Sequence, residues 1–194
     1  RPPRSTLFPY TTLFRSSAGA VTPVKEQTVI DGFDRSVTGP VPVESVLCSG
    51  SGCVRYLVYL QGEDLIAGVD SIEKEGRIPE GRPYSLVHGD WLKDLPLFGE
   101  FRGKDDPEKV IGIGPDLVFK TGSTGTAYGT SGVEADTLQE KTGIPVVAFP
   151  YGSLRDEAEK ADMYAGLRVI GASIGREDRD RKSTRLNSSH ESPS

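Results

Sequence analysis

The sequence predicts an α/β domain with a mainly parallel sheet, helices on both faces of that sheet and a β-hairpin near its N-terminal end. Apolar runs of strand length alternate with segments of helical period along most of the 194 residues. Glycine or proline separates these segments, as expected where strands and helices end. Residues 27–42 depart from the pattern, because a turn-like Asp31-Gly32 lies between apolar residues and a Pro-rich end follows. We therefore expect a hairpin that leads into a sheet with right-handed crossovers.

The first strand, turn and helix follow the hairpin directly. Residues 43–48 are a short β-rich run, which is followed by the glycine turn SGSG and by a helix over residues 53–60. Gly62 ends this helix, and residues 65–69 form the next predicted strand. Residues 72–97 are predicted to be a long polar loop, a kind of segment that often carries function.

The second half of the chain repeats the alternation of helix and strand. The predicted elements are a helix over residues 106–113, a strand over 117–121, a helix over 133–142, a strand over 145–149 and a helix over 154–174. A loop rich in glycine, serine and threonine precedes the middle helix, and Gly143 and Gly175 follow helix ends. The last helix is amphipathic, and much of its predicted apolar face comes from Ala158, Ala161, Leu167, Ile170 and Ile174.

The two ends of the chain differ in character from the rest. Residues 1–16 match the translation of a widely used short-read sequencing adaptor in one frame, and residues 180–190 match that of the opposite adaptor. We expect residues 1–16 and 180–194 to be adaptor-derived and disordered, and we exclude them from fold reasoning as one excludes a fusion scar. Residues 17–179, about 160 in number, then suffice for one domain with a real core.

Charge and hydropathy exclude several classes of function. The chain has 23 basic and 28 acidic residues, and the excess of acid is larger without the two ends. Acidic surfaces do not suit nucleic acid, whose phosphates select basic faces. No apolar run approaches the roughly 18 residues of a membrane span. Because the true start of the gene is expected to lie outside this sequence, the lack of a signal peptide does not indicate the cytoplasm.

The two cysteines leave three interpretations open. Cys48 and Cys53 are metal thiolates, a disulfide across the turn, or buried free thiols. A zinc site needs two further ligands, and His88 is the only histidine between the adaptor-like ends. We favour a buried, inert thiol for Cys48, which ends a strand, and keep the disulfide as the lesser alternative. We expect neither a metal site nor a cofactor.

Four motifs follow one another in an order that matches a known family. These are VPVESVLCSGSG, LIAGVDSI, DPEKVIGIGPDLVFKTG and LQEKTGIPVVAF, and the most specific part is residues 107–118. Their order resembles the N-terminal lobe of periplasmic or lipoprotein binding proteins that serve ABC importers of ferric siderophores, haem and cobalamin. CSGSGCVRYLVYLQ together with PLFGEFRG is similar to an archaeal iron-importer subgroup. The resemblance covers almost all of the chain between the adaptor-like ends.

The resemblance implies a Rossmann-like lobe of a bilobal protein, in which one long helix joins two lobes and ligand is gripped in the cleft between them. The chain stops where that helix is expected to begin, so we expect the C-terminal lobe to be missing and this chain alone to bind ligand weakly or not at all. The implied function is capture of a metal chelate outside the cytoplasmic membrane, with ferric siderophore foremost and cobalamin, haem or an oxyanion behind it. The implied partner is an ABC permease, and the protein is expected to be a periplasmic or lipid-anchored monomer.

Candidate ligand-binding residues lie at strand ends and in the loops. The turn Ser49, Gly50, Ser51 and Gly52 can present backbone N–H groups to an anion, or it is a tight turn without a ligand. Other side chains at the sheet edge or in loops can contact a flat chelate or its carboxylates, and these are Tyr84, His88, Trp91, Arg102, Thr121 and Tyr128. Surface packing is the alternative for the aromatic residues. For Arg102 the alternative is a salt bridge to Glu100 or Asp105.

Glu108, in the first turn of the PEKV helix, matches a glutamate that docks against permease arginines in the resembled family. Compensation of the helix dipole is the alternative role. The competing class of function is an α/β metal-cofactor enzyme or a chelatase-like domain with the same lobe fold. A serine or cysteine nucleophile would need a positioned histidine base, and His88 has no triad context. We therefore expect a binding protein without catalytic residues.

Overall fold

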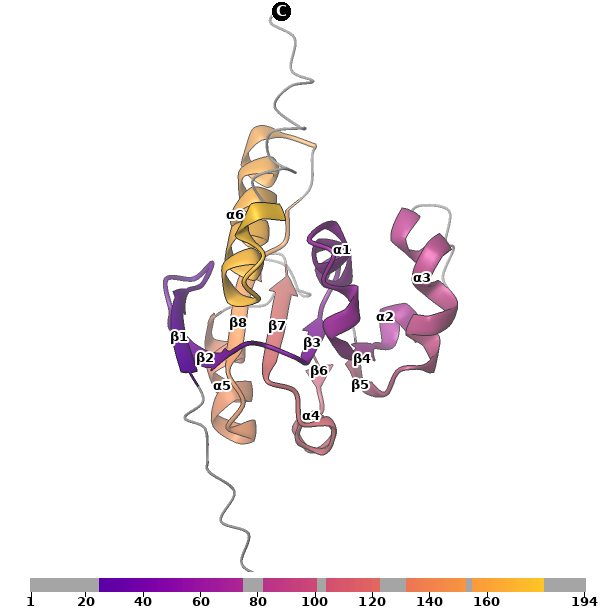
Figure 1. Cartoon of the computed structure of the whole chain (residues 1–194), viewed down its shortest axis with the longest axis vertical. Coiled ribbons are helices and arrows are strands. Elements are labelled where there is room, and N and C mark those ends of the chain that lie inside the picture. Colours follow the sequence, from indigo (N-terminus) through magenta and orange to yellow (C-terminus); the bar gives the residue numbers. More distant parts are fainter. Residues whose placement is uncertain (1–24, 75–81, 101–103, 123–131, 153–154, 180–194) are drawn as a thin grey trace, which may run out of the picture.

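A mainly parallel sheet forms the centre of the computed structural model, which describes residues 25–74, 82–100, 104–122, 132–152 and 155–179 (Figure 1). In sheet order its strands are β6 (Lys104–Asp105), β5 (Leu97–Glu100), β4 (Ile66–Asp70), β3 (Val46–Ser49), β7 (Leu117–Gly122) and β8 (Val146–Pro150). Neighbouring strands are parallel except for β5 and β6, which are antiparallel. The predicted mainly parallel sheet is confirmed. The adaptor-like ends lie outside the described residues, so their predicted disorder stays a prediction.

Helices cover both faces of the sheet. They are α1 (Cys53–Tyr59), α2 (Ser71–Lys74), α3 (Pro83–Asp94), α4 (Pro107–Ile113), α5 (Gly132–Thr142) and α6 (Glu157–Ser173), with a 3₁₀ turn at Glu63–Leu65. α1 and α6 pack together over one face, and α4 and α5 pack together over the other. Successive residues of a strand therefore enter different cores: Phe119 packs with α1 and α6, whereas Val118 packs with α4 and α5. Burial on both faces explains why the strands read as continuous apolar runs.

The predicted hairpin is present and closes one edge of the sheet. β1 (Lys25–Ile30) and β2 (Ser36–Val41) pair antiparallel in a separate two-stranded sheet. Their connecting turn lies along β8, where the Gly32 N–H donates to the Ala148 carbonyl at 2.8 Å. The Ala148 N–H donates in return to the Asp31 carboxylate at 3.1 Å. These bonds occupy backbone groups of β8 that an edge strand would otherwise expose.

Gly32 is required by this close approach. A Cβ built at Gly32 would lie 2.8 Å from Cα of Phe149 and 2.7 Å from Cδ of Pro150. Backbone atoms cannot move aside as a flexible side chain can, so a larger residue would push the turn away from β8. The turn-like Asp31-Gly32 pair thus has a tertiary role as well as a local one.

The longest helix is correctly predicted, but its buried face agrees only in part with the predicted one. Ala158 and Ala161 are exposed, whereas Leu167 and Ile170 are buried as expected. The buried residues of the helix begin at Met163, where Gly152 approaches the helix backbone closely. The two ends are capped by side chains. The Asp156 carboxylate accepts the Glu159 N–H at 2.9 Å, and the Gln27 side chain donates to the carbonyls of Ala172 and Ser173 at 3.0 and 2.7 Å.

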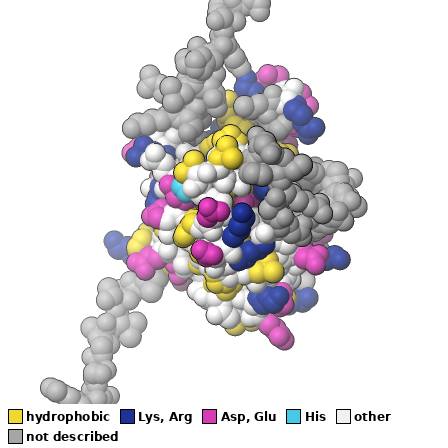
Figure 2. Space-filling view, turned by 90° about the vertical axis from the view of Figure 1, so that its right-hand side faces the viewer, with side chains coloured by type: hydrophobic (Ala, Val, Ile, Leu, Met, Phe, Trp, Pro, Cys, Tyr) yellow, Lys and Arg dark blue, Asp and Glu magenta, His cyan; other side chains and the backbone are white. Residues whose placement is uncertain are grey.

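The predicted long polar loop over residues 72–97 is wrong. This segment contains α2, α3 and the start of β5. Pro83 opens α3 at an early helical position, and Tyr84 and Leu92 face the core. Leu86, Val87 and Trp91 lie on the outer side of the same helix and are exposed, so apolar residues on both sides hide the helical period. Figure 2 views the molecule from the side that carries α3 and shows hydrophobic side chains at the surface among charged ones.

We predict that Asp31→Ala destabilises the domain by about 3–5 kcal/mol, the cost of breaking a buried, hydrogen-bonded ion pair. The Asp31 carboxylate is buried, accepts the N–H groups of Phe33 and Arg35 at 2.9 and 3.0 Å, and pairs with the Arg35 guanidinium at 2.8 Å. Urea unfolding followed by circular dichroism measures the change.

The matched control for this prediction is Asp136→Ala. Asp136 binds the same Arg35 at 2.9 Å, but its side chain is 57% exposed, so its loss should cost less than about 1 kcal/mol. Equal effects of the two substitutions would contradict the role assigned to Asp31.

Candidate ligand-binding pocket

The carboxyl ends of the parallel strands gather at one edge of the sheet. The parallel register of β3 with β4 and β7 places Ser49 beside Lys120 and brings the ends of β3 and β4, at Ser49 and Asp70, to the same level. The loop after β8 follows at that edge, where the Tyr151 N–H donates to the Gly122 carbonyl at 2.9 Å. Open α/β sheets bind their ligands at this edge.

A pocket of about 330 Å³ opens at this edge between α1, the start of α3 and the loop after β8. Its described lining consists of Ser51, Gly52, Arg55, Tyr59, Ile72, Arg82, Pro83, Tyr84 and Tyr151. Two guanidinium groups and three phenol rings belong to this lining, and none of its described residues is an acid. The lining therefore suits a ligand that is anionic and has flat or apolar surfaces.

Arg55 is held by aromatic rings on α1 and after β8. Its guanidinium carbon lies 4.9 Å from the centre of the Tyr56 ring and 5.4 Å from that of Tyr151. One terminal nitrogen donates to the Gly152 carbonyl at 2.9 Å, and Nε is buried without a hydrogen-bond partner among the described residues. Stacking against the rings fixes the guanidinium plane. The group is thus oriented in advance and keeps donors for a carboxylate, catecholate or other oxyanion.

The Tyr56 hydroxyl fixes the loop that carries Tyr151. It donates to the Gly152 carbonyl at 2.8 Å and accepts the Gly152 N–H at 3.0 Å. Burial raises the pKa of Tyr56, so the phenol stays protonated and keeps both bonds. This pair of bonds connects α1 to the loop after β8 and sets the distance between Arg55 and Tyr151.

Arg82 and Tyr84 form the opposite wall of the pocket, and the buried Glu73 binds both of them. The Tyr84 hydroxyl donates to the buried Glu73 carboxylate at 2.8 Å, and Arg82 approaches the same oxygen at 3.4 Å. Burial raises the pKa of Glu73, while the Tyr84 hydrogen bond and the Arg82 charge oppose that rise. Because its hydroxyl is engaged by Glu73, Tyr84 offers a ligand its ring edge rather than a free donor.

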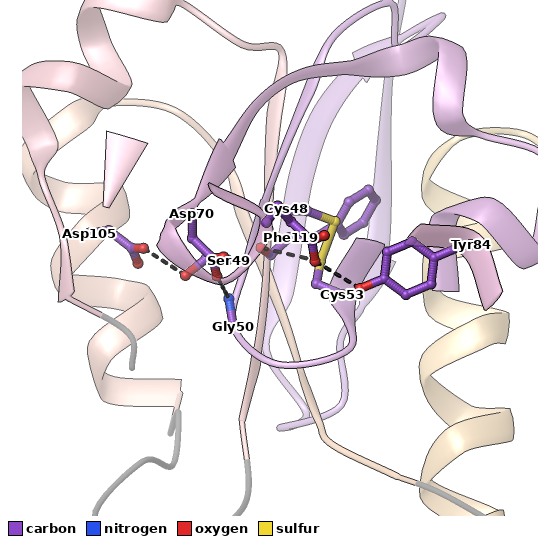
Figure 3. The surroundings of a disulfide bond; sticks show 9 residues. Cys48, Ser49, Gly50, Cys53, Asp70, Tyr84, Asp105 and Phe119 are labelled. Atoms are coloured by element: carbon purple, nitrogen blue, oxygen red, sulfur yellow. Dashed lines mark hydrogen bonds between the residues drawn. A yellow bond between two sulfur atoms is a disulfide. The ribbon is translucent and has the colours of Figure 1, made fainter. Parts of the chain in front are cut away.

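Two carboxylates hold the turn Ser49–Gly52 through hydrogen bonds (Figure 3). The Ser49 hydroxyl donates to Asp105 at 2.6 Å, and the Gly50 N–H donates to Asp70 at 2.8 Å. Gly50 has a φ of +93°, and a Cβ there would lie 2.0 Å from the Thr121 carbonyl oxygen. Since Gly50 already donates to an internal carboxylate, its N–H does not face an anionic ligand. Ser51 is the exposed member of the turn.

Two acids with buried side chains bind the turn after β3 and differ in their other partners. Asp105 forms an ion pair with Lys120, and both side chains are 2% exposed. Asp70 accepts the N–H groups of Gly50 and Ile72 at 2.8 and 3.0 Å. Burial is the main cause that raises the pKa of Asp70 to about 7, and the nearby charges of Glu73 and Asp105 add to it. Asp70 is therefore the acid at this edge that changes charge near neutrality.

Cys48 and Cys53 form a disulfide across the same turn (Figure 3). The favoured prediction of a buried free thiol at Cys48 is wrong, and the lesser alternative is what the structure has. The turn brings the two Cα atoms to 5.4 Å, within the range that a disulfide spans. Among the described residues no group of histidine, cysteine and acid side chains could hold a metal ion.

The predicted ligand residues are only partly brought together. Ser51, Gly52 and Tyr84 line the pocket, Ser49, Gly50 and Thr121 lie buried at the strand ends, and His88 and Trp91 lie on α3 without lining it. Arg102 and Tyr128 lie outside the described residues. The prediction missed Arg55, Tyr59, Arg82 and Tyr151. Tyr151 directly follows a predicted strand, so the rule that ligands bind beyond strand ends could have found it.

Glu108 does not line this pocket and is an exposed residue in the first turn of α4. Its N–H donates to the Asp106 carboxylate at 3.1 Å, which makes Asp106 the cap of that helix. The Glu108 side chain is thus available at the surface, and its docking role stays a prediction.

Solved structures of periplasmic binding proteins share this fold. A periplasmic solute binding protein from Veillonella parvula matches with a TM-score of 0.66 and 19% identity over 85% of this chain and 46% of its own. The molybdate-binding protein MolA of a Haemophilus influenzae ABC transporter matches with a TM-score of 0.61 and 19% identity over 80% and 48%. The siderophore-binding protein BauB matches with a TM-score of 0.59 and 15% identity over 84% and 51%.

The chain has the fold of about half of a periplasmic binding protein. It spans about half the length of the solved structures that it matches. No protein-family model and no curated protein matches the chain. None of the helices in the described ranges is long and apolar enough to span a bilayer.

We predict that the double substitution Cys48→Ala and Cys53→Ala lowers the free energy of unfolding by about 2 kcal/mol, as expected for a disulfide that closes a short loop. The cysteines are 5 positions apart. Urea unfolding with and without reductant measures the loss. The reductant should destabilise the native chain and leave the double variant unchanged, and a native chain insensitive to reductant would contradict the prediction.

We predict that Asp70 makes the domain less stable as pH rises. Its pKa is raised in the folded chain from 3.8 to about 7, so the folded state binds this proton more tightly than the unfolded state does. The stabilising contribution is complete below about pH 4 and is lost as pH rises through about 7, a change on the order of 4 kcal/mol. Urea unfolding between pH 4 and 8 measures the slope, and Asp70→Asn should remove this part of it. An unchanged slope in the variant would contradict the assignment.

Proposed function

We propose that this chain is the N-terminal lobe of an extracytoplasmic substrate-binding protein that captures a metal chelate and delivers it to an ABC permease. The observation that carries the proposal is the pocket at the carboxyl edge of the sheet. Its described lining contains two arginines and three tyrosines and lacks acids. A binding protein for an anionic chelate needs this combination of charge and flat surface.

A ferric siderophore is the ligand that the pocket favours. Siderophores present catecholate, hydroxamate or carboxylate oxygens around iron, and guanidinium groups such as that of Arg55 bind such oxygens through paired donors. The rings of Tyr59 and Tyr151 offer flat surfaces beside Arg55. BauB is described as a siderophore-binding protein, and MolA binds molybdate, so an oxyanion remains the second choice. Cobalamin and haem rank after these two candidate ligands.

Binding is favoured over catalysis by the position of His88. It is the one histidine within the described residues, and it lies on α3 and is absent from the pocket lining. A serine or cysteine nucleophile at this edge would therefore lack a histidine base. The cysteines are paired in a disulfide and are not available as nucleophiles. The solved structures with this fold are also named as binding proteins.

The disulfide supports a location outside the cytoplasm. Disulfides persist in oxidising compartments such as the periplasm or the cell surface and are rare in the cytosol. Cys48–Cys53 is buried, with both residues at most 1% exposed, so it is structural in character. An extracytoplasmic binding protein would dock on its permease, and exposed Glu108 is the residue that we assign to that contact. The resemblance to an archaeal iron-importer subgroup stays a prediction.

We predict that Arg55→Gln weakens binding of an anionic chelate by on the order of 10- to 100-fold, because a charge-assisted hydrogen bond is lost. The probe is gallium(III) tris-catecholate, a diamagnetic stand-in for the iron(III) complex. Titration into the ¹⁵N-labelled chain gives both the affinity and the residues whose amide signals shift, which should surround Arg55 and Tyr151.

The matched control is Arg168→Gln, which removes an exposed arginine of α6 that does not line the pocket. This variant should bind the probe as the native chain does. Molybdate serves as a second probe. If the shifted signals lie away from the pocket residues, or if both variants lose affinity equally, the proposed function is wrong.

A further inference from the structure

One buried carboxylate holds two walls of the pocket. Asp70 Oδ2 accepts the Gly50 N–H at 2.8 Å, and Asp70 Oδ1 accepts the Ile72 N–H at 3.0 Å. Gly50 belongs to the turn that presents Ser51 and Gly52 to the pocket, and Ile72 lines the pocket from α2. Asp70 itself is 1% exposed and does not line the pocket. The two walls are thus positioned by a group that no ligand touches.

The charges around Asp70 are acidic or already paired. Glu73 of α2 and Asp105 of β6 are the charged groups that act on it. Asp105 is neutralised by Lys120 of β7, and Glu73 is engaged by Tyr84 and Arg82 at the start of α3. Within the described ranges Asp70 has no ion pair, so its charged form depends on the two backbone N–H groups alone.

Both N–H bonds are strongest when the carboxylate is ionised. An ionised carboxylate accepts strongly at both oxygens, whereas a protonated one carries its proton on one of them and accepts only weakly there. Protonation therefore weakens the bond of either Gly50 or Ile72. Burial raises the pKa of Asp70 to about 7, which places this change within the range of natural environments.

We propose that Asp70 is a positioning residue that acts as a proton-dependent latch on the Ser49–Gly52 turn and the start of α2. Ionised Asp70 holds Ser51, Gly52 and Ile72 in their pocket-lining positions, and protonation releases one of the two walls. The latch is a property of this chain, and only its effect on ligand affinity rests on the proposed function. On that basis the pocket is set for capture at neutral and alkaline pH and is loosened in acid.

The latch is tested first without ligand, by nuclear magnetic resonance of the ¹⁵N-labelled chain between pH 5 and 9. The amide proton signals of Gly50 and Ile72 should move together in one transition centred near pH 7. The hydrogen-exchange protection of at least one of these amides should fall on the order of tenfold below the transition, because a neutral acceptor binds more weakly than a carboxylate.

Two variants separate the latch from general effects of pH. Asp70→Asn keeps one acceptor oxygen and cannot ionise, so its Gly50 and Ile72 signals should not titrate. Glu73→Gln removes a neighbouring charge but leaves Asp70 in place. Its Gly50 signal should still titrate, with a lower midpoint, because the Glu73 charge that opposes ionisation of Asp70 is gone. A Gly50 signal that stays constant in the native chain, or that titrates equally in Asp70→Asn, overturns the proposal.

The consequence for ligand is measured with gallium(III) tris-catecholate at pH 6 and pH 8. The ratio of native to Asp70→Asn affinity is compared at the two values, since protonation of the probe cancels in that ratio. We expect the ratio to rise at least threefold from pH 6 to pH 8, and a constant ratio overturns the positioning role. A probe that binds both proteins away from the pocket residues sinks the proposed function instead, while the amide titrations still decide whether the latch exists.

Discussion

Parallel pairing of β3 with β4 on one side and β7 on the other decides where the functional groups of this domain lie. A parallel neighbour can be reached only through a crossover connection, so each strand end leads into a turn or helix at the same edge. The turn after β3, the start of α2 and the loop after β8 therefore meet around one pocket. Arg55, Ile72 and Tyr151 become neighbours there although they are far apart in the sequence. The closed outer edge of β8 protects this arrangement, because the hairpin turn occupies its backbone groups.

Acidic and basic side chains at the carboxyl edge differ in burial. The side chains of Asp70, Glu73 and Asp105 are buried, and backbone N–H groups, a phenol, an arginine and a lysine bind them. Burying a carboxylate is costly unless such donors are present, so each acid needs its own internal partners. The guanidiniums of Arg55 and Arg82 remain in the pocket lining. The chain is acidic overall, but the charged residues in the described lining are both basic, so attraction of an anion there would depend on contact rather than on the long-range field.

The sequence predicts those parts of the structure that depend on local chemistry. The hairpin, the strands β3, β4, β7 and β8, and the helix α4 follow from turn residues, apolar runs and the Asp106-Pro107 helix start. α3 was missed because its exposed Trp91 and Val87 mask the helical spacing of Tyr84 and Leu92. The disulfide could not be decided from spacing, since it requires the turn geometry that brings the two Cα atoms to 5.4 Å. The role of Arg55 depends on Tyr151, which only tertiary packing brings beside it.

The disulfide and Asp70 act on the same turn in different ways. The covalent bond joins the residues that flank Ser49–Gly52, so the ends of the turn stay together whatever happens between them. Within the turn, the close approach of Gly50 to Thr121 leaves no room for a large displacement toward the sheet. Loss of the Gly50 bond to Asp70 can therefore shift the turn only slightly, toward the pocket. Because α1 begins directly after Gly52, such a shift changes the position of Ser51 relative to Arg55. A proton can in this way alter the pocket lining while the lobe remains folded.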